Sequence, residues 1–145
     1  MTVVLTRIVE TLPEGFSRLA DAAAAEGVRN MAALAAQWAD GTMRFEDPGA
    51  LFAAFVDGEL AGVGGVTLEG GLAEPAMRMR RLYIAPVFRR RGVGQALAGA
   101  MIQQGLQQAR LLIANARASA AAPPFWEAMG FAPVVARDHT HELRG

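Results

Sequence analysis

The chain has 145 residues, 52% of them hydrophobic, and its 14 basic and 14 acidic residues give a net charge of +0. We expect a single domain over residues 1–145, because a chain of this length can bury its own core. The chain contains no cysteine, which excludes disulfides and thiolate metal sites and fits a cytoplasmic protein. The first ten residues lack a signal-peptide pattern, and no apolar run reaches the roughly 18 residues of a membrane span, so we expect no membrane partner.

The balanced charge conceals two oppositely charged halves. Residues 1–74 contain 11 acidic residues and 4 arginines, whereas residues 75–145 contain 10 arginines and 3 acidic residues. Six of those arginines lie between Arg78 and Arg91, and the chain has no lysine. This asymmetry favours an anionic ligand on the basic side and a cationic one on the acidic side, unless folding mixes the two halves on the surface.

Hydrophobic periodicity divides the chain into alternating strands and helices. In chain order we predict a strand at 3–9, helices at 14–25 and 28–39, strands at 51–56, 60–68 and 76–84, a helix at 93–108, a strand at 111–114, a short helix at 123–129, and a strand pair or one bent strand at 131–143. Asp57-Gly58 predicts a tight hairpin, since both residues tolerate positive φ. The order β-α-α-β-β-β-α-β-α-β predicts an α/β fold in which a β-meander precedes a crossover helix.

The segment from Arg89 to Leu97 joins the third meander strand to the crossover helix. A glycine-bearing turn at a helix N-terminus presents unpaired backbone N–H groups and partial positive charge, which together favour a phosphate. A dinucleotide fingerprint requires a third glycine where this chain has Leu97, and it does not follow an antiparallel meander. A mononucleotide P-loop requires a lysine after its glycines, and this chain has none. With both nucleotide motifs excluded, the pattern left to explain is Arg-x-x-Gly-x-Gly, formed by Arg89, Gly92 and Gly94.

This pattern, directly after Leu82-Tyr83-Ile84-Ala85-Pro86, resembles the acyl-CoA-binding motif of the GNAT superfamily of N-acetyltransferases. Residues 122–131, APPFWEAMGF, resemble the second signature of that family, which usually ends Phe-Tyr-Glu-x-x-Gly-Phe. The resemblance covers nearly the whole chain. It implies a mixed, mostly antiparallel central sheet with helices on both faces, and acetyl-CoA or another acyl-CoA as the donor, with no metal.

The resemblance also implies a donor site. Backbone amides of the loop would hold the pyrophosphate, with arginine side chains adding charge; these residues are Arg89, Arg90, Arg91, Gly92, Val93, Gly94, Gln95 and Ala96. The backbone of Leu82, Tyr83 and Ile84 would pair with the pantetheine arm, and the Ile84 N–H would polarise the thioester carbonyl. The remaining donor-site residues implied are Asn115, Phe125 and Trp126.

The acceptor implied is a primary amine of a small molecule or protein, attacking the thioester directly in a ternary complex. An alkyl ammonium must lose a proton first, so a general base or a water chain is expected. The sequence does not identify the base; the candidates are Glu26, Glu46, Asp47, Glu74 and His141. The acidic N-terminal half favours a cationic acceptor.

Trp126 departs from the family, which usually has a tyrosine able to protonate the leaving thiolate. The indole N–H of Trp126 is too weak an acid to protonate the thiolate. Either Ser119 or water supplies the proton, or the thiolate leaves without being protonated. Ala121 replaces an asparagine common in a related signature. His139 and His141 alternate along the last predicted strand and should share a face, and they lack the third ligand that a metal site would require.

Two other functions compete with acyl transfer. One is a catalytically weak or inactive CoA-binding module, favoured by Trp126 and by the lack of an evident base. The other is nucleic-acid binding through the Arg78–Arg91 cluster, which is disfavoured because the cluster brackets a turn, aromatic residues are few and the other half is acidic. We therefore expect no nucleic-acid partner, and a homodimer is compatible with the family.

Overall fold

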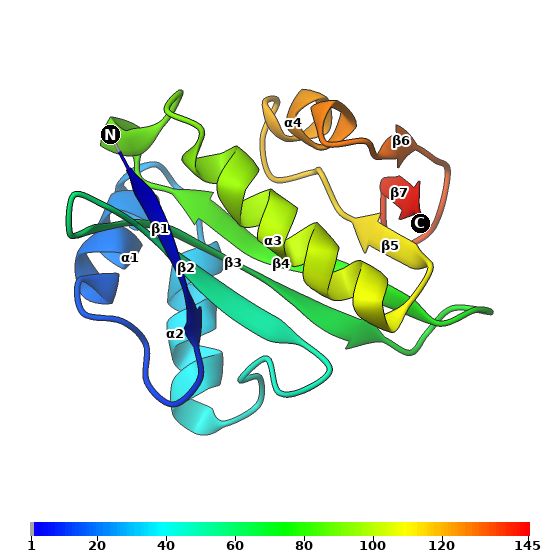
Figure 1. Ribbon diagram of the computed structural model, residues 1–145, viewed down its shortest axis with the longest axis horizontal. Helices are drawn as coiled ribbons and strands as arrows, with labels where there is room; N and C mark the ends of the chain where they lie inside the picture. Colours follow the sequence, from blue (N-terminus) through cyan, green and yellow to red (C-terminus); the bar gives the residue numbers. More distant parts are fainter. Residues whose placement is uncertain (1) are drawn as a thin grey trace.

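Residues 2–145 are described by the computed structural model, which contains four α-helices and seven strands within that range (Figure 1). In chain order the elements are β1 (Val3–Ile8), α1 (Phe16–Ala25), α2 (Asn30–Asp40), β2 (Ala50–Val56), β3 (Glu59–Glu69), β4 (Ala76–Ile84), the 3₁₀ turn η1 (Pro86–Phe88), α3 (Val93–Gln108), β5 (Leu111–Ala114), α4 (Ala122–Ala128), β6 (Ala132–Pro133) and β7 (His141–Arg144).

The strands form one mixed sheet in the order β1-β2-β3-β4-β5-β7-β6. Strands β1 to β4 form an antiparallel meander, β5 runs parallel to β4, and β7 is antiparallel to both β5 and β6. The parallel step requires a crossover connection, which α3 provides. The predicted mixed, mostly antiparallel sheet is therefore confirmed.

Helices cover both faces of the sheet, because alternate residues of each strand point to opposite faces. Leu51 and Ala53 of β2 pack with α1 and α2 in one core cluster, which includes Leu34. Ala54 and Val56 pack with Val93 and Leu97 of α3 on the other face, and α4 adds Trp126 to a neighbouring cluster there. No helix within residues 2–145 is long and apolar enough to cross a membrane.

Turn chemistry accounts for the ends of the meander strands. Asp57 and Gly58, with φ of 50° and 83°, form the predicted two-residue hairpin between β2 and β3. Strand β4 ends at Ile84, two residues before Pro86, which lacks the N–H that a sheet ladder requires. The predicted ranges of β4, α3 and β5 agree with the structure residue by residue.

The differences from prediction lie at helix starts and at the C-terminal end. α1 begins at Phe16 rather than 14, since Gly15 has a left-handed φ of 89°, and α2 begins at Asn30 rather than 28. The last segment is a strand pair, of which β6 has only two residues. His139 lies in the connection before β7 and not in a strand, so the prediction that it alternates with His141 along one strand is wrong.

Candidate active site

Strands β4 and β5 pair along only part of their length. The paired residues are Ala76 with Leu111, Met77 with Leu112, and Arg78 with Ile113. Beyond Arg78, β4 continues to Ile84 without a partner on its β5 side, and the two strands diverge. The edge of β4 from residue 79 to residue 84, which we call the open edge, therefore lies inside the sheet without a neighbouring strand to pair with.

A β-bulge shapes the open edge. Val63 pairs with Tyr83 whereas Gly65 pairs with Arg80, so β4 carries one extra residue opposite Gly64. Arg81 has a φ of 58°, a left-handed conformation that is uncommon for a residue with a long side chain. A bulge of this kind bends its strand and redirects a side chain, and such bulges are frequent beside active sites.

Hydrogen-bond alternation fixes which backbone groups face the open edge. The Ala85 N–H donates to the Ala61 carbonyl at 2.8 Å, so the neighbouring pair of Ile84 and Gly62 is not hydrogen-bonded and the backbone groups of Ile84 point away from β3. In agreement, the Ile84 carbonyl accepts a bond of 3.0 Å from Arg89 Nε. The backbone of Tyr83 faces β3 instead.

Leu82 also presents its backbone away from the β3 ladder. Its carbonyl accepts a hydrogen bond of 3.2 Å from Asn30 Nδ2, at the first residue of α2. Of the three strand residues predicted to bind the donor through their backbone, Leu82 and Ile84 have the orientation for it and Tyr83 does not.

The loop between η1 and α3 carries the features of an anion site. Arg90 and Gly92 have left-handed φ values of 62° and 81°, and no side chain caps the N-terminus of α3. The N–H groups of a helix's first turn have no intrahelical partner. The N–H of Ala96 differs from the other predicted donors, because it donates to the Gly92 carbonyl at 3.0 Å. The free amides of the helix therefore end at Gln95.

Gly94 brings three separate segments together. A Cβ built on Gly94 would lie 3.3 Å from Phe125 Cε1 of α4 and 3.6 Å from Ile84 Cγ1 of β4. Gly92 differs, since a Cβ there meets nothing within 4 Å and only the positive φ opposes a side chain. The loop, the open edge and α4 thus converge around Gly94, as the resemblance implies for the donor site.

The three loop arginines have different surroundings. Arg89 forms a bidentate ion pair with Glu26, which follows α1, at 2.8 and 2.6 Å. Arg91 lies over the ring of Phe88, 6.0 Å from its centroid, and Arg90 is exposed. The positive charge of Arg89 is therefore balanced by a carboxylate.

Tyr83 joins the same network, a connection that sequence reasoning missed. Its hydroxyl donates to Glu26 Oε1 at 2.5 Å, and Arg89 lies over its ring. The bonds from Arg89 and Tyr83 hold the pKa of Glu26 below its ordinary value of 4.5. A carboxylate held in this way is a weak base, which disfavours Glu26 among the candidates.

The predicted donor-site residues Asn115 and Trp126 lie outside β4, after β5 and in α4 respectively. Asn115 directly follows β5, accepts a bond of 3.2 Å from the Arg117 N–H, and lines a cavity at the open edge. Trp126 is only 6% exposed and packs edge-on against Phe125 and Phe131. Its indole is therefore a core group of the α4 side.

None of the five candidate bases lines this cavity within residues 2–145; its lining residues are Arg78, Met79, Arg80, Arg81 and Asn115. Glu74 pairs with Arg144 at 2.8 Å, and that bond lowers its pKa. Glu46 and Asp47 are exposed residues of the α2–β2 connection.

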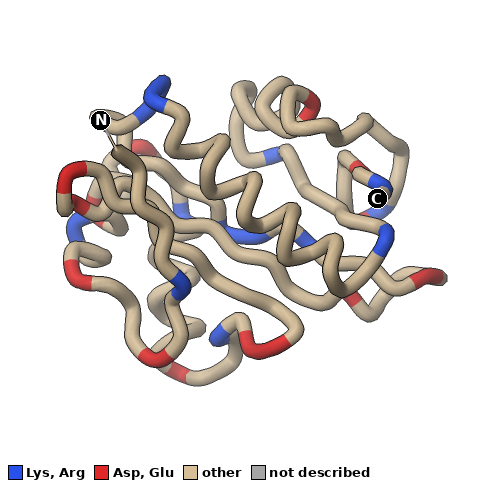
Figure 2. Tube along the Cα trace, viewed as in Figure 1, with Lys and Arg blue, Asp and Glu red and all other residues tan. Residues whose placement is uncertain are grey.

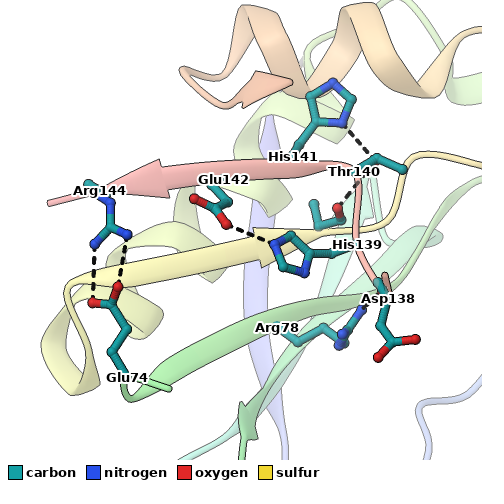
Figure 3. A network of polar contacts seen from close by, with 9 residues as sticks. Glu74, Arg78, Asp138, His139, Thr140, His141, Glu142 and Arg144 are labelled. Atoms are coloured by element: carbon teal, nitrogen blue, oxygen red, sulfur yellow. Dashed lines mark hydrogen bonds and ion pairs between the residues drawn. The ribbon is translucent and has the colours of Figure 1, made fainter. Parts of the chain in front are cut away.

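The two histidines have separate partners and point to opposite sides of β7 (Figure 3). His139 Nε2 lies 2.8 Å from Glu142 Oε2, and His141 Nε2 lies 2.8 Å from Glu127 Oε2 of α4. Both rings are buried. Each imidazole is thus held by a carboxylate, and across residues 2–145 no three metal-ligating side chains of the His, Cys, Asp or Glu type gather.

Tyr83, the only tyrosine of the chain, provides a direct test of the Glu26 network. Burial and the bond to Glu26 raise its pKa from 10.0 to about 12. We expect ultraviolet titration of the phenolate to show one midpoint near pH 12, and Glu26→Gln to move it toward 10 because the negative charge is lost. The fold favours the protonated phenol, so this contribution to stability is complete below pH 10 and is lost as the pH rises to about 12.

Circular dichroism at each pH is the control for that titration. A midpoint near 10 in a protein that circular dichroism shows to be folded would contradict the network.

A sheet that opens between two parallel strands beside a glycine-bearing helix N-terminus is the architecture of an acetyltransferase fold. The family model described as Acetyltransferase (GNAT) family matches residues 14–131, and the chain belongs to this family. No curated protein sequence matches the chain.

Solved structures support the assignment of the fold. A protein assigned as an acetyltransferase from Exiguobacterium sp. 255-15 is 24% identical, with a TM-score of 0.88 over 99% of this chain and 94% of that one. A protein assigned as an acyl-CoA N-acyltransferase from Klebsiella pneumoniae is 19% identical, with a TM-score of 0.69 over 98% and 97%. Glucosamine-6-phosphate N-acetyltransferase from Arabidopsis thaliana is 13% identical, with a TM-score of 0.66 over 94% and 96%.

Proposed function

We propose that this protein transfers an acetyl or other acyl group from an acyl-CoA to a primary amine, by direct attack within a ternary complex. The observation that carries the proposal is the open edge of β4, which places the outward-facing Ile84 backbone beside the uncapped N-terminus of α3. The donor supplies an activated thioester, and the residues of this chain bind and orient it.

The loop amides from Arg90 to Gln95 suit the pyrophosphate, because backbone N–H groups and the helix dipole favour negative charge there. The open edge of β4 suits the amide groups of the pantetheine arm, as in the addition of a strand to a sheet edge. The Leu82 and Ile84 carbonyls there already accept bonds from Asn30 and Arg89, so each would bind the arm through its second lone pair. The Ile84 N–H is the donor we assign to the thioester carbonyl.

For the proton transfers of the proposed reaction, the structure offers few side chains that could act as base or acid. The amine nitrogen forms a bond to the acyl carbon, the carbon–sulfur bond breaks, and the proton leaves the nitrogen. Glu26 is committed to Arg89, and none of the candidate bases lines the cavity, so we assign proton removal to water. Trp126 cannot return a proton to the thiolate, which leaves unassisted.

A thiol-release assay tests the function. We expect acetyl-CoA to release free thiol only when a suitable amine is present. Because the chain contains no cysteine, the protein itself adds no thiol background to the assay. The buried Trp126 and the absence of a candidate base at the cavity also favour a second function, a CoA-binding module without turnover. CoA binding without thiol release across a broad amine panel would support that second function.

A further inference from the structure

Two consecutive arginines of β4 extend toward the same side of the sheet. Arg80 Nε donates to Thr67 Oγ1 of β3 at 2.8 Å, and an Arg81 amino group donates to Gln37 Oε1 of α2 at 2.9 Å. In a regular strand neighbouring side chains point to opposite faces. The bulge at Arg81 removes that alternation, so the side chains of Arg80 and Arg81 reach partners on the α2 side of the sheet, and both residues line the cavity of the open edge.

These two charges have no carboxylate partner within residues 2–145. Arg78, which also lines the cavity, differs because it is paired with Glu69 at 2.5 Å. The partners of Arg80 and Arg81 are a hydroxyl and an amide, and the buried Arg81 Nε has no hydrogen-bond partner among residues 2–145. Burial lowers the pKa of both. For Arg80, repulsion from Arg78 lowers the pKa further, and attraction to the more distant Glu69 carboxylate partly opposes the shift.

Partly buried charges without a direct ion pair are costly to maintain, and a bound anion would offset that cost. Figure 2 shows basic segments along the middle of β4, whereas acidic segments are concentrated in the turns and connections around it. The expected cationic acceptor rested on the charge of the whole N-terminal half, but the side chains at the cavity have the opposite sign.

The position along β4 relates this charge to the proposed reaction. Arg81 precedes Ile84 by three residues, a separation of at most about 10 Å along a strand. A small molecule with an amino group near the Ile84 N–H therefore brings an attached anionic group within reach of the arginine side chains.

We propose that Arg80 and Arg81 bind a carboxylate or phosphate group of the acceptor, so that the substrate is a small amine that also carries an anion. The inference rests on the proposed acyl transfer and names its acceptor class. Guanidinium groups suit this role because their planar N–H donors match the oxygens of either anion.

Matched acceptor pairs test the inference. Comparing glycine with glycinamide as acceptors measures the effect of a carboxylate, and comparing O-phosphoethanolamine with ethanolamine measures the effect of a phosphate. We expect at least one anionic member to exceed its neutral partner by tenfold or more in kcat/KM. Arg80→Gln and Arg81→Gln should each remove most of that preference through KM, with the dissociation constant for CoA unchanged. Arg110→Gln, which removes an exposed arginine outside the cavity, is the charge-matched control.

Calorimetry with the same four amines, in the presence of saturating CoA, separates this inference from the proposed function. Binding of an anionic amine that requires Arg80 and Arg81, without thiol release, would refute acyl transfer and retain the anion site. Equal use and equal binding of the anionic and neutral members would overturn the inference. It would also be overturned if the variants weakened CoA itself, because the arginines would then belong to the donor site.

Discussion

Gly92→Val is expected to lose CoA affinity by at least about a hundredfold, which corresponds to about 2.7 kcal/mol. Gly92 is the last residue before α3 and holds a φ of 81°, which valine resists. In the proposed donor site the chain turns there, so that the amides of Val93, Gly94 and Gln95 point at one anion. A Cβ on Gly92 meets nothing within 4 Å, so the effect comes from the backbone conformation and from the space that the phosphate needs.

Gly41→Val provides a matched control for backbone strain. Gly41 ends α2 with the same φ of 81°, and a Cβ there also meets nothing within 4 Å. Both variants should lose about 1–3 kcal/mol of stability from the strained conformation, measured by urea unfolding. Only Gly92→Val should lose CoA binding in calorimetry. Unchanged CoA affinity in a folded Gly92→Val protein would refute the phosphate loop.

Ile84→Pro should lower kcat by about 10²–10³, the usual effect of removing one preorganised donor from a developing oxyanion. The Ile84 N–H does not belong to the β3 ladder, so proline removes no sheet hydrogen bond there. Proline is tolerated in strands at positions where the missing N–H faces away from the neighbouring strand. We therefore expect the variant to fold and to bind CoA.

Ile84→Val is the control, since it shortens the side chain and keeps the N–H. It should retain near-normal kcat, and steady-state thiol release with saturating acetyl-CoA measures both variants. A proline variant with wild-type kcat would exclude the Ile84 N–H as the donor to the carbonyl.

Much of the fold follows from local patterns. The Asp57-Gly58 turn, Pro86 after β4, and the apolar run of β5 each have a local physical cause, and their elements match prediction closely. The start of α1 was not predicted correctly, because it depends on Gly15, which the folded chain holds in a left-handed conformation with a φ of 89°.

The candidate site could be predicted only where function depends on the backbone. Glycine spacing predicts the turn before α3 that we propose as the phosphate loop, since few residues tolerate the positive φ of Gly92. The bulge at Arg81 depends on register between two strands, and the pairing of Glu26 with Arg89 joins residues 63 positions apart. Neither leaves a local sequence signal. The run Arg-Met-Arg-Arg at residues 78–81 was visible in the sequence, but its two adjacent arginines would ordinarily face opposite sides of a strand.

The open edge of β4 also affects solubility. Unpaired strand edges are templates on which a second chain can pair and aggregate. Here the exposed backbone lies between β4 and β5, within the sheet rather than at its border, and like charges from Arg80 and Arg81 flank it. A bulge further interrupts the regular spacing that an incoming strand would need. These features make the open edge a poor template for a second β-strand, although it lacks a partner strand of its own.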